Sequence, residues 1–289
     1  MPAFKTVALI GRNESPGIAK ALAALGAYLR TQGCAVLVEK ETAAINGVTG
    51  FPLADYPEIG ARADLVVVQG GDGSMLSAAR SLAGQDVPLV GVNQGRLGFM
   101  TDIASTKMIE AMSEILAGKQ VIEERTMLAA EVRRGGAVAF ATLALNDAVV
   151  NKGSVGRLIE FVVNIDGEFV YDLRADGLIV TSPTGSTAYA LSANGPIVQP
   201  GVPGFALVPI SPHTLSNRPI MISDRSIIEI SLKHAVEARL HFDGQLQCDL
   251  QEGDRVLIRR AEHTIKFVHP PGYSYFAMLR EKLHWSEGL

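Results

Sequence analysis

The segment GGDGS at residues 70–74 has the residue types that a phosphate-handling turn needs. It directly follows the apolar run 65–68, which is typical of a buried parallel strand. Glycines in such a turn let backbone N–H groups converge on an anion, and a following helix N-terminus adds partial positive charge. A carboxylate does not suit phosphate binding, so we interpret Asp72 as a general base or metal-facing group beside a phosphate donor. The motif therefore predicts phosphoryl transfer, with Ser74 capping a helix over 75–83.

A second polar segment, NQGRLGF at 93–99, ends the next predicted strand, 88–92. Because ligands gather at the carboxyl ends of parallel strands, we expect this segment to lie beside residues 70–74. A simple interdomain linker is the alternative interpretation.

Asn146 and Asp147 close the apolar run 143–145. An amide next to a carboxylate suits ribose hydroxyls, because each hydroxyl both donates and accepts a hydrogen bond. The same pair also marks ordinary turns, so it is weak evidence by itself.

The block TSPTGSTAYALS at 181–192 is dense in hydroxyl groups, which suits a polyoxygenated ligand. Ser186 or Thr187 can cap a short helix aimed at that ligand, although a capped surface helix has the same pattern. The later DGQ at 243–245 is most typical of a hairpin turn.

Several familiar signatures do not occur in the chain. It has no GxxxxGK[ST], no GxGxxG after a strand and no HExxH, and its six histidines lack metal-ligand spacing. A P-loop mechanism is therefore excluded, and a standard Rossmann dinucleotide-binding site is not supported. No residue is predicted as a metal ligand.

Composition narrows the class of partner. The 289 residues are 47% hydrophobic and 19% charged, with a formal net charge of −4, which argues against nucleic-acid or anionic-membrane binding. The N-terminal apolar run 7–10 is too short for a signal sequence or a membrane span, and the two cysteines lack CxxC spacing. We expect a cytoplasmic protein.

The pattern of elements predicts two domains. Strand and helix signals alternate up to about residue 102, which predicts an open parallel sheet, with a loop over 42–57. After a helix over 107–116 come strands with turn signals at 135–136, 166–167 and 243–244. A last helix, over 273–283, is expected to pack back on the first domain. We predict an α/β nucleotide-binding domain (1–102, plus about 271–289) and a β-rich antiparallel dinucleotide-binding domain (103–270).

Taken together, these motifs resemble those of bacterial NAD kinases, enzymes that convert NAD to NADP with ATP. The resemblance spans almost the whole chain, and it is carried by GGDGS, NQGRLGF, LND at 145–147 and DGLIVTSPTGSTAYALSANGP at 176–196, with weaker echoes in RPIMIS at 218–223 and FDGQ at 242–245. The 182–189 block is the discriminating one, because diacylglycerol kinases and 6-phosphofructokinases have a similar GGDGS. This chain has Ser182 where many relatives carry Thr, and Asp147 where many carry Glu.

The resemblance implies a role for individual residues. Asp72 would accept the proton of the 2′-hydroxyl of the adenosine ribose, and Gly73 would lie against the dinucleotide. Asn146 and Asp147 would bind ribose and base edges. The adenine side would be lined by Thr187, Ala188, Tyr189, Ala190, Leu191 and Ser192, and weaker motifs add Arg157, Arg174, Asp176 and Gln245 as further contacts.

The resemblance also implies a Rossmann-like α/β domain followed by a β-rich domain, as in NAD kinases and diacylglycerol kinases. It implies ATP with Mg²⁺, NAD as the substrate, and a homodimer or homotetramer. Two alternatives share part of the pattern. A lipid kinase of the diacylglycerol kinase type needs an exposed apolar or basic membrane face, whereas a non-catalytic NAD(P) sensor needs no carboxylate beside the phosphate turn.

Overall fold

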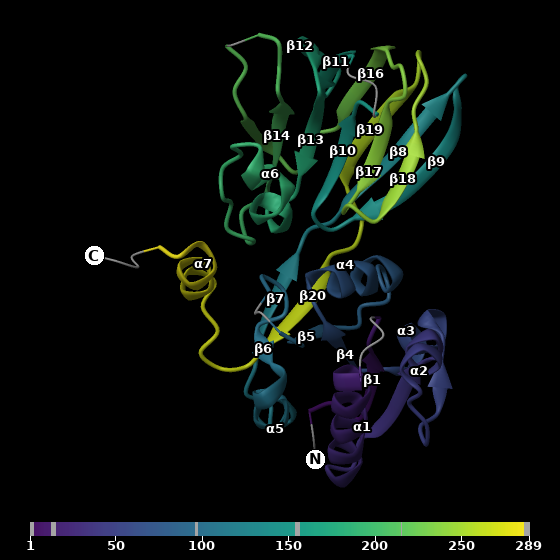
Figure 1. The fold of residues 1–289 in the computed structure, drawn as a ribbon, viewed down its shortest axis with the longest axis vertical. Coiled ribbons are helices and arrows are strands. Elements are labelled where there is room, and N and C mark those ends of the chain that lie inside the picture. Colours follow the sequence, from purple (N-terminus) through teal and green to yellow (C-terminus); the bar gives the residue numbers. More distant parts are fainter. Residues whose placement is uncertain (1–2, 13–15, 96–97, 154–156, 215, 286–289) are drawn as a thin grey trace. The chain divides into compact units, whose positions relative to one another are not determined.

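The computed structural model describes residues 3–12, 16–95, 98–153, 157–214 and 216–285 (Figure 1). The chain divides into two compact units, Met1–Glu124 with Ile265–Leu289, and Arg125–Thr264. The predicted division differs at 103–124 and 265–270, which group with the first unit. The reason is packing: Met112 and Ile115 belong to the core of that unit, and residues 265–269 form a strand of its sheet.

The first unit is built on one eight-stranded sheet with the order β3-β2-β1-β4-β5-β20-β7, in which β6 also pairs with β5. The pairings of β1 with β2 and β4, and of β5 with β4 and β20, are parallel, which confirms the predicted parallel sheet. The strands are β1 (Thr6–Ile10), β2 (Ala35–Glu39), β3 (Leu53–Ala54), β4 (Leu65–Gly70), β5 (Leu89–Asn93), β6 (Ile103–Ala104), β7 (Val121–Arg125) and β20 (Ile265–His269).

Helices surround this sheet. Leu22, Leu25 and Leu29 on α1 lie one helical turn apart and pack into the core with Val36 and Val38 of β2. The helices are α1 (Pro16–Thr31), α2 (Lys40–Asn46), α3 (Tyr56–Arg62), α4 (Asp72–Ser81), α5 (Met108–Leu116) and α7 (Tyr275–Leu283), with a 3₁₀ turn over Ser105–Lys107. None of the helices in the described ranges is long and apolar enough to cross a membrane.

The prediction of a loop over 42–57 is wrong, because side-chain caps support short elements there. The buried carboxylate of Glu39 accepts the N–H groups of Glu41 and Thr42 and starts α2. Asp55 and Glu58 form a reciprocal capping box at the start of α3. These caps outweigh the turn-forming Gly, Pro and Asn residues around them.

The predicted start of α4 is also wrong. The helix begins at Asp72 with Gly71 as its N-cap, and Ser74 lies inside the first turn. Ser74 is buried, and a Cβ on Gly70 would overlap its hydroxyl. The absence of a side chain at Gly70 therefore lets α4 begin directly against the end of β4.

The second unit is an antiparallel sandwich, which confirms the predicted β-rich domain. One sheet has the order β15-β14-β13-β10-β17-β18 and the other β12-β11-β16-β19-β8-β9. Phe161, Phe205 and Phe242 are fully buried in the core between them. The strands are β8 (Leu128–Arg134), β9 (Ala137–Ala144), β10 (Asp147–Asn151), β11 (Ile159–Ile165), β12 (Glu168–Ala175), β13 (Gly177–Thr181), β14 (Gly204–Ile210), β15 (Ile220–Ser223), β16 (Ile228–His234), β17 (Arg239–Phe242), β18 (Leu246–Asp249) and β19 (Arg255–Arg260).

All three predicted hairpin turns are confirmed. Both central residues have positive φ at Gly135–Gly136, at Asp166–Gly167 and at Asp243–Gly244. Each turn joins two antiparallel strands that pair with each other. Two residues with positive φ match the twist of the flanking strands, which is why Asp-Gly and Gly-Gly are favoured there.

A short helical segment covers the outer face of the sheet that contains β10. It consists of a 3₁₀ turn over Thr184–Thr187 and the single-turn helix α6 (Tyr189–Ser192). Ala190 packs against Val149 and Val208 in a small separate core. The hydroxyl-rich block of the sequence is thus fixed on this face.

Candidate active site

Asp72 lies at the carboxyl end of β4, as the first residue of α4, and its side chain is partly exposed. Its Oδ2 accepts the N–H of Phe99 at 2.8 Å, and its Oδ1 accepts the N–H of Met100 at 2.9 Å and the hydroxyl of Thr101 at 3.3 Å. Gly70 and Asn93 are paired neighbours on β4 and β5. The expected proximity of the two polar segments is confirmed.

The contacts orient the Asp72 carboxylate without using all of its accepting capacity. A carboxylate offers about four lone-pair directions. Among the residues that the structure describes, three donors contact this carboxylate, and Oδ2 accepts one of them. A Cβ on Gly98 would overlap Oδ1 of Asp72, so the loop approaches the carboxylate this closely because residue 98 is glycine.

Positive charge also lies near this edge of the sheet. The N-terminus of α4 carries the partial positive charge of the helix dipole, and Gly73 in its first turn is exposed. Arg12 follows β1, and its guanidinium donates to Ser77 on α4 and lies 3.5 Å from Glu41. The motifs did not indicate Arg12, because a single basic residue after a strand has no distinctive pattern.

In the second unit, the carboxylate of Asp243 holds the segment that starts β10. It accepts the N–H groups of Leu145 at 3.1 Å, Asn146 at 2.7 Å and Asp147 at 3.3 Å. The N–H of Asp243 in turn donates to the carbonyl of Asp147 at 3.0 Å. The Asp-Gly turn predicted from sequence therefore also fixes the LND motif.

The LND motif is locked to the hydroxyl-rich block as well. The carbonyl of Asn146 accepts the hydroxyl of Thr181 at 3.0 Å and the N–H of Ser182 at 2.9 Å. A Cβ on Gly185 would overlap the same carbonyl. The side-chain Oδ1 of Asn146 is buried and has no hydrogen-bond partner in the part of the chain that the structure describes. Buried polar atoms are normally paired, so this oxygen is a candidate ligand contact.

Asp147 has a strongly perturbed acidity. Burial, and secondarily the negative charge of Asp243, raises the pKa of Asp147 to about 7. Near neutral pH its carboxyl group is present in both protonation states. The protonated form donates a hydrogen bond and the ionised form accepts one, which suits ribose hydroxyls.

A pocket of about 330 Å³ joins the two motifs. Asn146 and Asp147 line it together with Ala188 and Tyr189, and the remaining lining residues are Val149, Asn151, His241, Asp243 and Gly244. Sequence reasoning missed His241. Its strand neighbour Phe242 is buried in the sandwich core, so the alternation of β17 directs His241 to the outer face. Burial, and secondarily Arg239, lowers the pKa of His241, which favours its neutral form.

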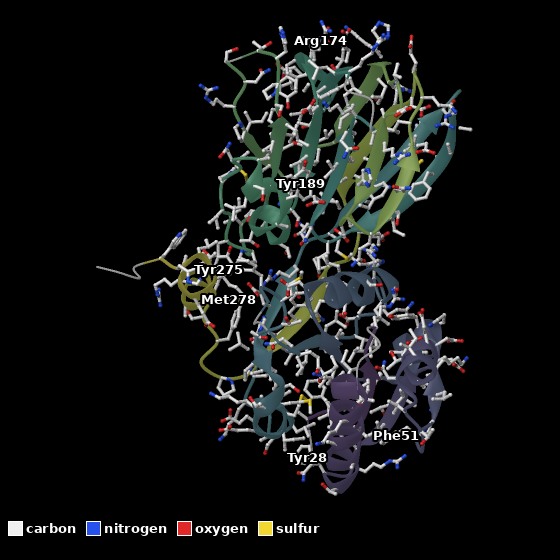
Figure 2. All side chains as sticks on the ribbon, in the orientation of Figure 1. Tyr28, Phe51, Arg174, Tyr189, Tyr275 and Met278 are labelled. Atoms are coloured by element: carbon white, nitrogen blue, oxygen red, sulfur yellow. The ribbon has the colours of Figure 1, made fainter. Side chains whose placement is uncertain are left out.

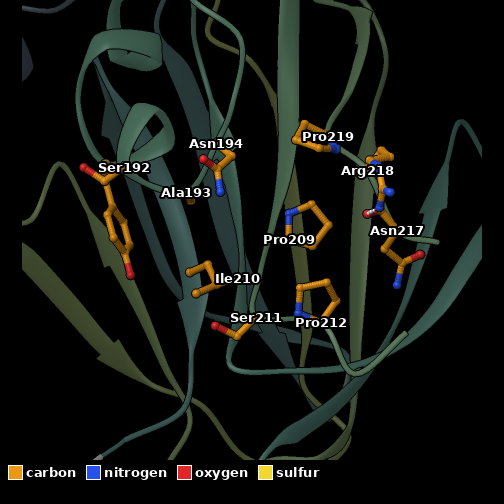
Figure 3. Close-up of a pocket in the computed structure, with 11 residues that line it drawn as sticks. Ser192, Ala193, Asn194, Pro209, Ile210, Ser211, Pro212, Asn217, Arg218 and Pro219 are labelled. Atoms are coloured by element: carbon orange, nitrogen blue, oxygen red, sulfur yellow. Dashed lines mark hydrogen bonds between the residues drawn. The ribbon is translucent and has the colours of Figure 1, made fainter. Parts of the chain in front are cut away.

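A second pocket, of about 580 Å³, is drawn in Figure 3, and Tyr189 is among the lining residues of both pockets. Its lining is polar and proline-rich: Tyr189, Ser192, Ala193, Asn194, Pro209, Ile210, Ser211, Pro212, Asn217, Arg218 and Pro219. The only sequence signal for the part of this lining between residues 209 and 219 was the weak resemblance of the RPIMIS segment.

Comparison with known proteins identifies the family. The ATP-NAD kinase N-terminal domain family matches residues 7–120, and the ATP-NAD kinase C-terminal domain family matches residues 145–270. The chain belongs to the NAD kinase family. Its relatives include the NAD kinase of Aromatoleum aromaticum, 55% identical over 98% of this chain and 95% of the relative, and that of Thiobacillus denitrificans, 53% identical over 99% of each.

Two solved structures share the fold. Yeast NADH kinase complexed with NADH has a TM-score of 0.90 at 26% identity, covering 100% of this chain and 90% of that one. An NAD kinase from Archaeoglobus fulgidus in complex with ATP has a TM-score of 0.76 at 24% identity, covering 96% and 98%. The two-domain architecture predicted from sequence is thus that of NAD kinases.

The other residues predicted from the block lie in or near the same helical segment. Tyr189 is exposed, and Figure 2 shows it on the helical side of the second unit. Thr187 and Leu191 are half-buried, whereas Ala190 is buried in the small core and can reach a ligand only through its backbone. Gln245 is exposed at the end of the Asp243–Gly244 turn.

Among the residues described, seven predicted contacts of the second unit line neither pocket: Arg157, Arg174, Asp176, Thr187, Ala190, Leu191 and Gln245. Arg157 is exposed between β10 and β11. Arg174 lies 3.5 Å from Glu160 and apart from Tyr189 in Figure 2. Asp176 pairs with Lys152 at 2.6 Å, at the end of β13 opposite Thr181. Their roles stay predictions.

Proposed function

We propose that this chain transfers the γ-phosphoryl group of ATP to the 2′-hydroxyl of the adenosine ribose of NAD, with Asp72 as the general base. Membership of the NAD kinase family assigns the reaction, ATP-dependent phosphorylation of NAD to NADP. The observation that supports the role of Asp72 is its carboxylate, which the 98–101 loop orients while Oδ2 accepts a single donor within the described ranges.

In this mechanism the 2′-hydroxyl donates its proton to Oδ2 of Asp72. The ribose oxygen then forms a bond to the γ-phosphorus as the bond to the β-phosphate oxygen breaks, and ADP leaves. The proton on Asp72 is afterwards released to solvent. A well-placed general base contributes about 10²–10⁴-fold to such a step.

The phosphates of ATP carry the negative charge that the first unit must offset. The N-terminus of α4, the glycine turn before it and Arg12 are the groups proposed to do so. Mg²⁺ bound to these phosphates neutralises a further part of the charge. Mg²⁺ commonly binds through substrate phosphates with one or two carboxylates, and no group of three His, Cys, Asp or Glu ligands occurs in the described ranges. We therefore assign the metal to the ATP complex.

The second unit is proposed to bind NAD through the pocket of about 330 Å³. The unpaired Oδ1 of Asn146 and the carboxyl of Asp147 fit hydroxyl and base edges, and the exposed ring of Tyr189 offers an aromatic face to a base. Gly73, Ser192 and the remaining residues predicted from the family motifs stay predictions. The assembly into a homodimer or homotetramer also stays a prediction, and light scattering after gel filtration tests it. The cytoplasmic location stays a prediction as well.

One assay tests the reaction. Purified protein with ATP, Mg²⁺ and NAD should form NADP, whereas diacylglycerol in place of NAD should not be phosphorylated. A sensor would bind NAD without turnover of ATP. Replacing ATP by polyphosphate, or NAD by NADH, then defines the donor and acceptor preference.

Asp72→Asn tests the base. We expect kcat to fall about 10²–10⁴-fold, with little change in the melting temperature or in NAD binding by calorimetry. Asp86→Asn is the matched control, because Asp86 is exposed in the same unit and pairs with Lys266. Near-normal turnover of Asp72→Asn would remove Asp72 from the base role. Partial rescue by a larger divalent ion would indicate instead that Asp72 orients the metal.

A further inference from the structure

His269, the last residue of β20, is buried between two carboxylates in the first unit. Its Nδ1 lies 2.9 Å from Oδ2 of Asp102, and its Nε2 lies 3.4 Å from Oε2 of Glu123 on β7. The ring of Tyr273 stacks on the imidazole with a centroid separation of 3.7 Å and an interplanar angle of 7°. The imidazole is therefore held on both edges and on one face. None of the motifs pointed to it.

Asp102 connects this cluster to the proposed base. It directly follows Phe99, Met100 and Thr101, the residues that donate to the carboxylate of Asp72. Oδ1 of Asp102 is buried without a hydrogen-bond partner among the residues described, so His269 is the partner shown for this carboxyl group. The loop that orients Asp72 is thus tied at its far end to β20.

The protonation state of His269 decides how strongly it interacts with Asp102. A neutral imidazole donates one hydrogen bond, whereas an imidazolium donates at both nitrogens. Burial lowers the pKa of His269, but the hydrogen bond to Asp102, the nearby carboxylate of Glu123 and the negative charges of both groups outweigh it and raise the pKa. The titratable groups that face the ring are Asp102 from the 98–102 loop, Glu123 from β7 and Tyr273 from the segment after β20.

We propose that protonated His269 is a positioning residue for Asp72: by holding Asp102, it fixes the 98–101 loop that orients the Asp72 carboxylate. This inference rests on the proposed role of Asp72 as the general base. Small displacements of a reacting group cost turnover more than they cost substrate affinity, because the transition state demands closer geometry.

The pH dependence of the reaction distinguishes the role of Asp72 from that of His269. A general base acts in its ionised form, so the role proposed for Asp72 needs a deprotonated group and the role proposed for His269 needs a protonated one. The ion pair of His269 with Asp102 requires the imidazolium, so it is complete at low pH and weakens to a neutral hydrogen bond as pH rises through the raised pKa of His269. We therefore assign the loss of kcat at alkaline pH to His269.

His269→Gln tests the inference, with His263→Gln as the matched control because His263 is exposed between β19 and β20. We expect kcat to fall about 10-fold or more at neutral pH, while the KM values for NAD and ATP change by less than about twofold. The alkaline loss of kcat should disappear from the profile of the variant. Hydrogen–deuterium exchange at the Phe99 and Met100 amides should become faster, but the exchange of β1 should not.

Asp102→Asn provides a second variant if His269→Gln folds poorly. It should show the same faster exchange and lower kcat, and the double variant should be no worse than either single one, since both changes break one contact. Unchanged exchange at Phe99 and Met100, or faster exchange with normal kcat, would overturn the inference. Near-normal turnover of Asp72→Asn in the same assay would overturn the proposed base instead, independently of His269.

Discussion

Asp72 in the first unit and Asp243 in the second both accept backbone N–H groups with their carboxylates, but the contact serves opposite purposes. Each carboxylate accepts consecutive backbone N–H groups from a segment far away in the sequence. Asp72 is partly exposed, whereas Asp243 is buried, with 8% of its surface exposed. In the first unit the loop orients the carboxylate, and in the second the carboxylate orients the loop.

The difference shows what decides whether an acidic side chain is available for chemistry. Oδ2 of Asp72 accepts one N–H from the part of the chain that the structure describes, and the side chain is partly exposed, so it can still take a proton. Asp243 accepts three N–H groups in a buried place. Burial, and secondarily the charge of Asp243, raises the pKa of Asp147. In the second unit the residue with the raised pKa is therefore Asp147, and Asp243 is the residue that anchors the backbone.

Asp243→Ala is expected to have the largest effect on stability. It leaves the N–H groups of Leu145, Asn146 and Asp147 buried without this acceptor, at a cost of about 3 kcal/mol in the free energy of unfolding. Urea unfolding measures the loss. Asp166→Ala is the control, because Asp166 sits in the same kind of Asp-Gly turn but accepts the N–H of Ile227 near the surface. Equal losses in the two variants would show that the turn matters and the buried N–H groups do not.

Gly98→Ala should break the orientation of Asp72 without removing it. The added methyl group overlaps Oδ1 of Asp72, so the carboxylate must move, and a displacement of this kind lowers kcat by up to about 10²-fold. Steady-state kinetics checks this, with KM expected to stay close to that of the wild type. Gly95→Ala in the same loop should lose far less, because the space around Gly95 is open. A normal kcat for Gly98→Ala would mean that the contacts of Asp72 with the loop do not serve catalysis.

The most gradual expected effect, spread over several pH units, is a pH dependence of stability from Asp147. Because the pKa of Asp147 is raised to about 7, the folded state binds this proton more tightly than the unfolded state does. Its stabilising contribution is complete below the ordinary aspartate pKa and is lost as pH rises to about 7. A tenfold difference in proton affinity between the folded and unfolded states corresponds to about 1.4 kcal/mol. Urea unfolding across this range should show the decline, and Asp147→Asn should flatten it; the same slope in the variant would assign it to another group.

Local sequence patterns were enough to predict those elements whose structure depends mainly on residues close by in the sequence. The apolar run 65–68 predicted β4, and the Asp-Gly and Gly-Gly pairs predicted three hairpin turns. The parallel sheet followed from alternating strand and helix signals. Local patterns failed at 42–57 and at Ser74, where the buried cap Glu39 and close packing against Gly70 override local preference.

The candidate site was predictable only as a set of motifs. GGDGS pointed to Asp72 as a base beside a phosphate turn, LND pointed to Asn146 and Asp147 as ribose contacts, and the resemblance to NAD kinases added Tyr189. Nothing in these motifs indicated His241, His269 or Arg12, which are single polar residues in otherwise ordinary strands or loops.

The sequence by itself determined the class of chemistry and the family, since those depend on which residue types occur at which spacing. Only the tertiary structure decided that β20 returns to the first sheet, that Asp243 anchors residues 145–147, and that His269 reaches Asp102. The physical reason is sequence separation: these contacts join residues about a hundred or more positions apart, and their energy comes from burial and hydrogen bonding that exist only once the chain has folded.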